Sequence, residues 1–266
     1  LDSKTAGFQP SDLIIIAGRP AMGKTSLAVN IAENAAIKDK RSVAIFSMEM
    51  SAEQLVMRMM SSLANIDQNR VKHGNLKDED YERFTSTIDM LRETEIYIDD
   101  TAALTPAELR ARCRRISREH GLDLVVIDYL QLMQVPGSKE NRNAEISEIS
   151  RSLKAMAKEL NVPVIALSQL NRAVDSRTEK RPNMSDLRDS GSLEQDADVI
   201  IFIYRESEYE EHKDTADPGM AEILLRKQRN GPTGNLKLAW RGEYTRFDNY
   251  IPDPLAVDNS VVGKYE

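Results

Sequence analysis

The chain has 266 residues, of which 41% are hydrophobic, 5% aromatic and 30% charged, and its formal net charge is −7. This composition fits a single α/β domain with an aliphatic core and excludes a protein that coats nucleic acid over its whole surface. A lone cysteine, Cys113, excludes an intrachain disulfide, and no Cys/His cluster has the spacing of a zinc site. Its apolar runs are too short for a membrane span, so we expect a cytoplasmic protein without a membrane partner, and the start at Leu1 suggests a piece of a longer chain.

Strand and helix patterns alternate along the sequence. Helical spacing covers residues 26–38, 52–64, 78–94, 106–120 and 144–160, with Thr105 as the expected N-cap before Pro106. Continuous aliphatic runs at residues 13–17, 43–46, 124–127 and 162–167 predict strands covered by helices on both faces, and 95–98 is a weaker candidate. Shorter runs at 199–204, 221–226, 236–240 and 245–247, split by turns, predict an antiparallel edge. We therefore expect one α/β domain over residues 1–250, with a mostly parallel central sheet flanked by helices, and a polar tail at 251–266.

A glycine-rich loop follows the first expected strand and precedes the first long helix. Its sequence, GRPAMGKT at residues 18–25, matches the G-x-x-x-x-G-K-[ST] pattern of a phosphate-binding P-loop, also called Walker A. Backbone N–H groups and a helix N-terminus would hold the phosphates, Lys24 would bridge the β- and γ-phosphates, and Thr25 would bind Mg²⁺. The alternative is a chance glycine-rich turn. The predicted nucleotide-binding residues here are Gly18, Arg19, Pro20, Ala21, Met22, Gly23, Lys24, Thr25 and Ser26.

Acidic residues end three of the expected strands. Asp128 follows an aliphatic run, where a second acid can hold Mg²⁺ through water, although it could instead cap the next segment. Glu49 ends another buried run and is the expected general base; the alternative is a solvated loop glutamate. Asp99 and Asp100 end the weaker strand and rank below Glu49 for the same role.

Polar residues that follow the expected strands at 162–167 and 221–226 complete the candidate site. Gln169 would sense the γ-phosphate, unless it only hydrogen-bonds nearby backbone, and the segment after it, residues 170–191, carries no clear secondary-structure pattern. That segment could contact single-stranded DNA or be an ordinary charged loop. Lys227 and Arg229 lie before a tight turn, where they could either reach a neighbouring subunit's nucleotide as trans-acting cations or remain surface charges.

Seven strings occur in the order typical of one family: AGRPAMGKT at 17–25, FSMEM at 46–50, VIDYLQL at 126–132, ALSQLNR at 166–172, DLRDSGS at 186–192, QDAD at 195–198 and KQRNG at 227–231. In these strings the chain resembles the C-terminal, RecA-like P-loop ATPase domain of DnaB-type bacterial replicative DNA helicases, over residues 1–250. The N-terminal helical domain and linker helix of full-length members are not in this sequence, and Asp189 stands where the family tends to have glutamate.

The resemblance implies a ring hexamer that encircles one DNA strand, hydrolyses ATP with Mg²⁺ at subunit interfaces and moves 5′ to 3′ to unwind duplex DNA. It also implies a helicase loader and primase as partners of the full-length protein, in a bacterial cytoplasm. The roles that the family assigns are nucleotide and Mg²⁺ binding for Lys24, Thr25 and Asp128, catalysis for Glu49, sensing for Gln169, trans-acting charge for Lys227 and Arg229, DNA contact for Arg188, Asp189 and Gly191, and proximity to adenine for Arg58.

Three other functions remain open at this point. A RecA-like recombination or repair ATPase would share the fold, but the string at residues 186–192 favours the helicase. A small-molecule kinase would share the P-loop, but no lid or acceptor pocket is evident in the sequence. A nucleotide-gated ring-assembly module would use hydrolysis only as a timer, and DNA-stimulated turnover would argue against it.

Overall fold

The structure is a computed structural model of the chain that describes residues 1–135 and 142–251, with the backbone alone at residues 3 and 188–190. Apart from Ile251, the expected polar tail lies outside the described residues. Among the residues described, no helix is both long and apolar enough to cross a membrane.

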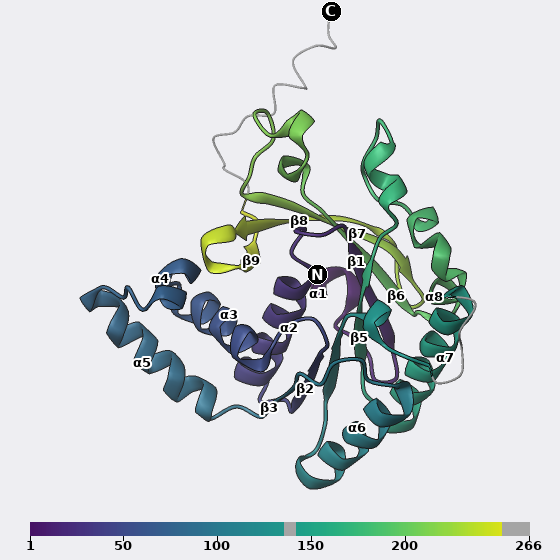
Figure 1. Ribbon diagram of the computed structural model, residues 1–266, viewed down its shortest axis with the longest axis horizontal. Helices are drawn as coiled ribbons and strands as arrows, with labels where there is room; N and C mark the ends of the chain where they lie inside the picture. Colours follow the sequence, from purple (N-terminus) through teal and green to yellow (C-terminus); the bar gives the residue numbers. More distant parts are fainter. Residues whose placement is uncertain (136–141, 252–266) are drawn as a thin grey trace, which may run out of the picture.

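A nine-stranded sheet forms the centre of the molecule, in the order β3-β2-β4-β5-β1-β6-β7-β8-β9 (Figure 1). Neighbouring strands are parallel from β3 to β6 and antiparallel from β6 to β9. This is the expected mostly parallel sheet with an antiparallel C-terminal edge. The strands are β1 (Leu13–Gly18), β2 (Val43–Ser47), β3 (Ile96–Asp99), β4 (Leu124–Asp128), β5 (Val164–Gln169), β6 (Val199–Tyr204), β7 (Met220–Gln228), β8 (Gly234–Arg241) and β9 (Arg246–Asn249).

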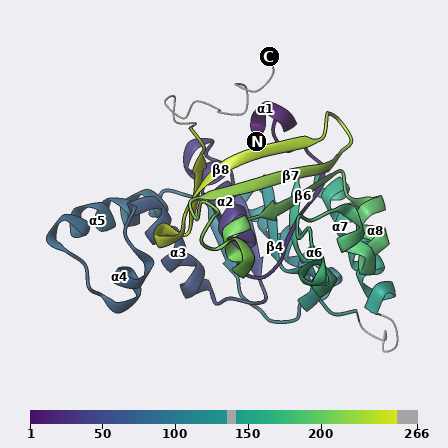
Figure 2. The same cartoon turned by 90° about the horizontal axis from the view of Figure 1, so that it is seen from above.

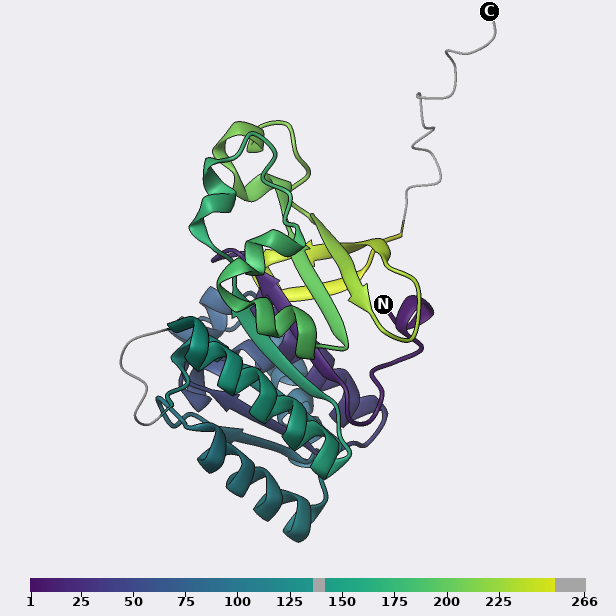
Figure 3. The same ribbon diagram turned by 90° about the vertical axis from the view of Figure 1, so that its right-hand side faces the viewer.

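Helices cover both faces of the sheet (Figures 1 and 3). The chain runs from β1 to β2 in one direction across the sheet and from β3 through β4 and β5 to β6 in the other. Because such crossovers are right-handed, the two groups of connecting helices must lie on opposite faces. The helices are α1 (Asp2–Thr5), α2 (Lys24–Lys38), α3 (Ala52–Ala64), α4 (Gln68–His73), α5 (Asp78–Arg92), α6 (Pro106–His120), α7 (Arg142–Leu160) and α8 (Gly191–Asp196).

The parallel strands form the core because their side chains are covered on both faces. Every residue of β1, β2 and β4 is buried, as their continuous aliphatic runs predict. Every residue of β6 is buried too, because this strand, expected at the antiparallel edge, pairs in parallel with β1. Strand β8, at the antiparallel edge, instead alternates between half-buried and exposed residues along much of its length. The N-cap prediction for α6 is also confirmed, since Thr105 and Glu108 form a capping box.

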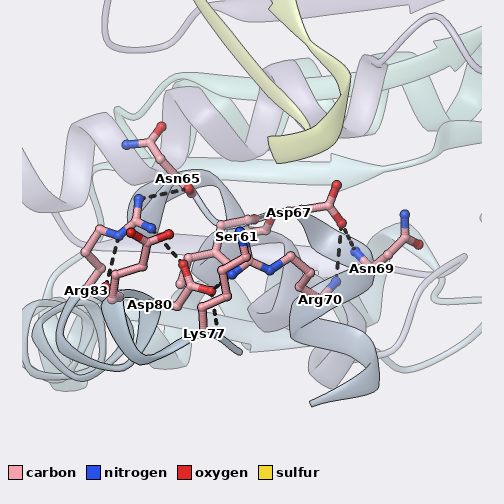
Figure 4. A network of polar contacts seen from close by, with 10 residues as sticks. Ser61, Asn65, Asp67, Asn69, Arg70, Lys77, Asp80 and Arg83 are labelled. Atoms are coloured by element: carbon pink, nitrogen blue, oxygen red, sulfur yellow. Dashed lines mark hydrogen bonds and ion pairs between the residues drawn. The ribbon is translucent and has the colours of Figure 1, made fainter. Parts of the chain in front are cut away.

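Helices α3, α4 and α5 form an extension to one side of the sheet (Figure 2). Its polar centre is Asp80, whose side chain is completely buried and accepts hydrogen bonds from the guanidinium groups of Arg70 and Arg83 and from the backbone N–H of Lys77 (Figure 4). The pairing of a buried carboxylate with two cations ties α4 to α5, where few apolar residues are available to do so.

The segment between β5 and α8 differs from the structureless loop expected at residues 170–191. It contains two 3-10 helices, η2 (Arg172–Ser176) and η3 (Met184–Ser190). Ion pairs hold it in place: Arg177 binds Asp186, and Arg181 binds Glu222 of β7. Sequence patterns miss such elements because each is shorter than the window of about 11–18 residues over which helical periodicity is recognised.

Candidate nucleotide-binding site

Four strands deliver the candidate catalytic residues to one edge of the sheet. Gly18 of β1 pairs with Gln169 of β5, and Ser47 of β2 pairs with Asp128 of β4. Since these strands are parallel, their carboxyl ends meet at the same edge, which is where open α/β sheets bind ligands. The structure therefore brings together the P-loop, Asp128, Gln169 and the residues just after β2, including Glu49.

The P-loop turns sharply between β1 and α2. Ala21 has a φ of +66° and Gly23 a φ of +93°, and Gly23 is the N-cap of α2. The left-handed backbone turns the chain so that α2 begins directly at Lys24, and the free N–H groups of its first turn face the edge of the sheet. This arrangement suits oxygen atoms of a phosphate chain.

Lys24 is held inside the loop. Its Nζ donates to the carbonyl oxygen of Arg19 at 3.1 Å. Burial lowers the pKa of Lys24, and the positive charge of Arg19 lowers it further, whereas the carboxylates of Asp128 and Glu49 raise it. A partly desolvated ammonium gains more from a phosphate than an exposed one would, because the charges interact in a medium of low polarity.

Thr25 and Asp128 form the candidate Mg²⁺ site. The Thr25 hydroxyl donates to Oδ2 of Asp128 at 2.7 Å, and Asp128 is only 3% exposed. Burial raises the pKa of Asp128, as does the charge of Glu49, while the Thr25 hydrogen bond and the charges of Lys24 and Arg58 oppose the rise. Hydroxyl and carboxylate oxygens are the ligands that Mg²⁺ prefers, so the pair fits this ion. Among the described residues there is no group of three or more His, Cys, Asp or Glu side chains that could form a separate metal site.

Glu49 is exposed at this edge and lies close enough to Lys24, Arg58 and Asp128 for their charges to interact. The competing carboxylates have other partners: Asp99 binds Arg112, and Asp100 accepts from the backbone N–H of Ala52 at the start of α3 at 2.9 Å. Their use in structural contacts favours Glu49 as the general base, which stays a prediction.

Gln169 is oriented by a residue that the sequence did not single out. The side chain of Gln131 donates to the Ser168 hydroxyl at 2.9 Å and to the Gln169 carbonyl at 3.3 Å, and it accepts from the Gln169 N–H at 3.3 Å. The Gln131 side chain therefore fixes the backbone of Gln169 at the carboxyl end of β5, beside the P-loop. The string VIDYLQL contains Gln131, but only the fold reveals its contact with β5.

Arg58 lies beside the carboxylates, at the phosphate end of the site. Burial lowers its pKa, while the charges of Asp128 and Glu49 raise it, and its Nε is buried with no hydrogen-bond partner among the described residues. The expectation that Arg58 lies near the adenine rests on resemblance alone, since these neighbours are acids of the hydrolytic centre.

Residues from the antiparallel edge support the back of the P-loop and were missed in the sequence. Arg205 donates to the Ala21 carbonyl at 3.1 Å and stacks over the Trp240 ring at 4.7 Å. The ring of Phe247 fills the space that a side chain at Gly23 would occupy, and the backbone N–H of Phe247 donates to Asn30 of α2 at 2.9 Å. The hydrogen bonds to Ala21 and Asn30 join residues more than 180 positions apart, so no local pattern indicates them.

Lys227 and Arg229 lie at the other end of the parallel strands, where β1 and β6 begin. Val199, which pairs with Gln228, lies at the amino end of β6 beside Ile14, roughly 13 Å along the strands from Gly18 at the usual rise per residue. Lys227 donates to the Glu194 carbonyl at 2.5 Å, and Arg229 donates to the Gln195 carbonyl at 2.9 Å.

Asp198 anchors Arg229 to the start of β1. Its carboxylate is 3.3 Å from Nε of Arg229 and accepts from the Leu13 N–H at 2.7 Å. The structure thus separates Lys227 and Arg229 from the P-loop of their own chain and fixes Arg229 at the other end of the sheet.

Arg188, Asp189 and Gly191 form the candidate DNA-contacting segment. Gly191 is exposed as the first residue of α8, whereas the side chains of Arg188 and Asp189 lie outside the described residues. Three other cations between β5 and α8 bind acids of the same chain: Arg177, Lys180 and Arg181 pair with Asp186, Glu211 and Glu222.

A cavity of about 880 Å³ lies away from this edge, between α2, the amino-terminal segment and the antiparallel strands. Glu33 of α2 lines it and accepts hydrogen bonds from Asn30 and Ser62 at 3.1 and 3.0 Å. Burial raises the pKa of Glu33 to about 8. This protonated acid belongs to the support of α2 rather than to the phosphate site.

Comparison with known proteins agrees with this geometry. Residues 1–249 match the model of the DnaB-like helicase C terminal domain. Proteins named replicative DNA helicase DnaB are 57% identical in Buchnera aphidicola subsp. Baizongia pistaciae and 56% identical in Pasteurella multocida, over 252 residues that cover 94% of this chain and 54% of each relative. The chain thus spans about half the length of these relatives.

Two solved structures are similar over 94% of the chain, each with a TM-score of 0.89 and 37% sequence identity. One, described as an ATPase domain, is covered to 88%; the other, a DnaB-like replicative helicase described with its interactions with primase, is covered to 60%. The fold is the one expected from the sequence, and the chain belongs to the DnaB-like helicase C-terminal domain family.

Proposed function

We propose that this chain is the ATP-hydrolysing motor domain of a replicative DNA helicase. It acts within a homo-oligomeric ring, hydrolyses ATP between subunits and moves 5′ to 3′ along single-stranded DNA to unwind the duplex at the replication fork. Family membership supports this function. In the longer protein, a helicase loader and primase are the proposed partners, in line with the structural relative that was described with primase.

The observation that carries the proposal is the placement of the two halves of the site at opposite ends of the parallel strands. Lys24, Thr25 and Asp128 lie at the carboxyl end of β1 and β4, whereas Arg229 is bound to Asp198 at the amino end of β1. One chain cannot bring Arg229 to its own P-loop, but a neighbour in a head-to-tail ring can. The complete ATP site is therefore proposed to lie between subunits.

Each group has a distinct proposed role. The N–H groups at the start of α2 and the Lys24 ammonium bind the β- and γ-phosphates, while Thr25 and Asp128 hold Mg²⁺. When bound, Mg²⁺ offsets the charge of the phosphate oxygens. Glu49 accepts the proton of the attacking water, and Gln169 responds to the γ-phosphate.

Lys227 and Arg229 of a neighbouring subunit would neutralise the charge that develops on the transferred phosphoryl group. Arg188, Asp189 and Gly191 would lie along the DNA backbone inside the ring, so that one strand contacts the segment that follows the sensor strand. The adenine-side role of Arg58 is proposed from resemblance only.

The test is ATP hydrolysis measured across protein concentration, with and without single-stranded DNA, at two salt concentrations. A cooperative rise with protein concentration and a salt-sensitive stimulation by DNA support a motor that is active at subunit interfaces. Turnover that is independent of both concentration and DNA would contradict the proposal and favour a self-contained ATPase or kinase.

Mixing of two inactive variants tests the composite site directly. Arg229→Ala and Lys24→Ala should each abolish hydrolysis, and mixing them should restore part of it because the two lesions can fall in different sites. Arg226→Ala is the matched control: Arg226 lies in β7, three residues before Arg229, but binds Asn235 of β8 at 2.6 Å, so its loss should leave hydrolysis largely intact. No recovery at any mixing ratio would rule out the trans-acting role of Arg229.

A further inference from the structure

The P-loop is joined to the segment after β5 by the side chain of Arg19. Its Nε and Nη2 donate to the two carboxylate oxygens of Asp175 at 3.0 and 2.5 Å, and its Nη1 donates to the Leu170 carbonyl at 2.9 Å. The Arg19 side chain is only 11% exposed. A bidentate arginine–carboxylate pair fixes both the distance and the orientation of the elements that it joins.

At the nucleotide end, this link lies next to the catalytic lysine. Lys24 donates to the backbone carbonyl of Arg19, the same residue whose side chain binds Asp175. If Lys24 turns away from this carbonyl to bind phosphate, the backbone of Arg19 loses that hydrogen bond. Nucleotide binding therefore changes the constraints on one end of the Arg19–Asp175 pair.

At the other end, Asp175 lies in η2, which is bound to η3. The Arg177 guanidinium binds Asp186 at 2.8 Å, and the Asn171 N–H donates to the Asp186 carbonyl at 3.2 Å. Element η3 contains Arg188 and Asp189, two of the three positions proposed to contact DNA, and the third, Gly191, follows it directly as the first residue of α8. The contacts of Lys24, Arg19 and Asp175 are thus continued to η3 through the backbone of η2 and the residues that flank it, Asn171 and Arg177.

The environment of the pair makes its charge effective. Asp175 is 44% exposed, and its charge also acts on Tyr209, whose hydroxyl is buried without a hydrogen-bond partner among the described residues. Burial raises the pKa of Tyr209 to about 12, and the negative charge of Asp175 adds to that rise. The charge of Asp175 therefore acts on a buried hydroxyl as well as on Arg19.

We propose that Asp175 is a positioning residue that couples nucleotide binding at the P-loop to the position of η3 and so to the affinity for single-stranded DNA. The inference rests on the proposed function, because it requires that η3 contacts DNA. Asp175 touches neither ATP nor the reacting atoms; it acts through Arg19. Coupling of this kind is measured as the factor by which one ligand changes the affinity for the other.

The experiment measures the affinity of the chain for a fluorescent oligothymidylate, with and without a non-hydrolysable ATP analogue and Mg²⁺. The ratio of the two dissociation constants is the coupling factor. Asp175→Asn should reduce this factor by roughly three- to tenfold, within the usual range of coupling energies, while the affinity for the analogue without DNA stays within about twofold.

Two variants separate coupling from a merely structural role. Asp175→Glu keeps the charge and should retain most of the coupling factor. Glu211→Gln removes the ion pair of Glu211 with Lys180, which lies in the same region but does not contact the P-loop, and should leave the factor unchanged. Because Asp175 is 44% exposed, none of these changes should abolish folding, which thermal unfolding checks.

The outcomes are distinct. Loss of the coupling factor in Asp175→Asn, with retention in the other two variants, supports the inference. An unchanged factor in Asp175→Asn, or an equal loss in Glu211→Gln, overturns it while leaving the motor function intact. If the unmodified chain binds DNA equally well with and without the analogue, the proposed function fails and the inference fails with it.

Discussion

Gly23 is the position at which the P-loop tolerates a side chain least. A Cβ atom there would lie 2.8 Å from Cζ and 3.0 Å from Cε2 of Phe247, and the backbone has a φ of +93°. The left-handed backbone costs an alanine about 1–2 kcal/mol, and overpacking against a buried ring costs about 1–3 kcal/mol. Gly23→Ala should therefore lower the free energy of unfolding by about 2–5 kcal/mol.

Gly74 provides the matched control. It also has a positive φ, +67°, but a Cβ atom there meets nothing within 4 Å, so Gly74→Ala should cost only the backbone contribution of about 1–2 kcal/mol. Phe247→Leu removes the ring atoms that cause the clash. In that background, Gly23→Ala should cost about as much as Gly74→Ala, because only the backbone contribution remains.

Urea unfolding followed by far-UV circular dichroism gives all of these free energies. If Gly23→Ala and Gly74→Ala cost the same, and Phe247→Leu does not change the cost at Gly23, then the ring does not support the P-loop as described. A loss of affinity for nucleotide in Gly23→Ala that Phe247→Leu partly reverses would link this support to ligand binding.

Three further changes test other parts of the structure. The pKa of Glu33 is raised to about 8 from an ordinary 4.5, so the native state keeps a proton that the unfolded chain releases, and the free energy of unfolding should fall between about pH 4.5 and pH 8. Glu33→Gln should remove at most about 5 kcal/mol of that fall. An equal pH dependence of urea unfolding in both proteins would refute this prediction. Asp80→Asn should destabilise α4 and α5 by about 1–3 kcal/mol, because both of its arginine partners are partly exposed, and hydrogen exchange should rise at residues 68–92 but not in β1. Glu49→Gln should still bind ATP but lose roughly 10²–10⁴-fold in hydrolysis rate, whereas Asp100→Asn should not; the reverse result would make Asp100 the better base.

The buried strands and long helices were predictable because each carries its own periodic signal. The expected strand at residues 199–204 and the expected helices at 52–64 and 106–120 have the same bounds in the structure. The strand expected at residues 162–167 begins two positions early; Pro163 has no N–H to donate at the start of β5, although its carbonyl accepts from the Val125 N–H at 3.1 Å. Helices α4 and α8, of six residues each, are too short for periodicity to reveal.

The residues of the candidate site could be predicted where a sequence motif contains them. They could not be predicted where only tertiary contacts give them a role. The P-loop and Asp128 follow from spacing and from their place at strand ends. Gln131, Arg205 and Trp240 were missed because their roles depend on contacts with strands distant in the sequence. The distance of Arg229 from its own P-loop also required the strand order, which adjacent residues do not encode.

The anchoring of Arg229 to Asp198 means that the length of β1 sets the distance between Arg229 and the P-loop of the same chain. This strand of six residues ends in the P-loop and begins at Leu13, whose N–H binds the carboxylate that also holds Arg229. In a ring of the proposed kind, each β1 would span the gap between the ATP of its own subunit and the ATP of the next, with roughly 17 Å from Leu13 to Gly18 at the usual rise per residue. Successive ATP sites would then be spaced by the length of a buried strand, so that a closing movement at one site would shift the next site as a rigid step.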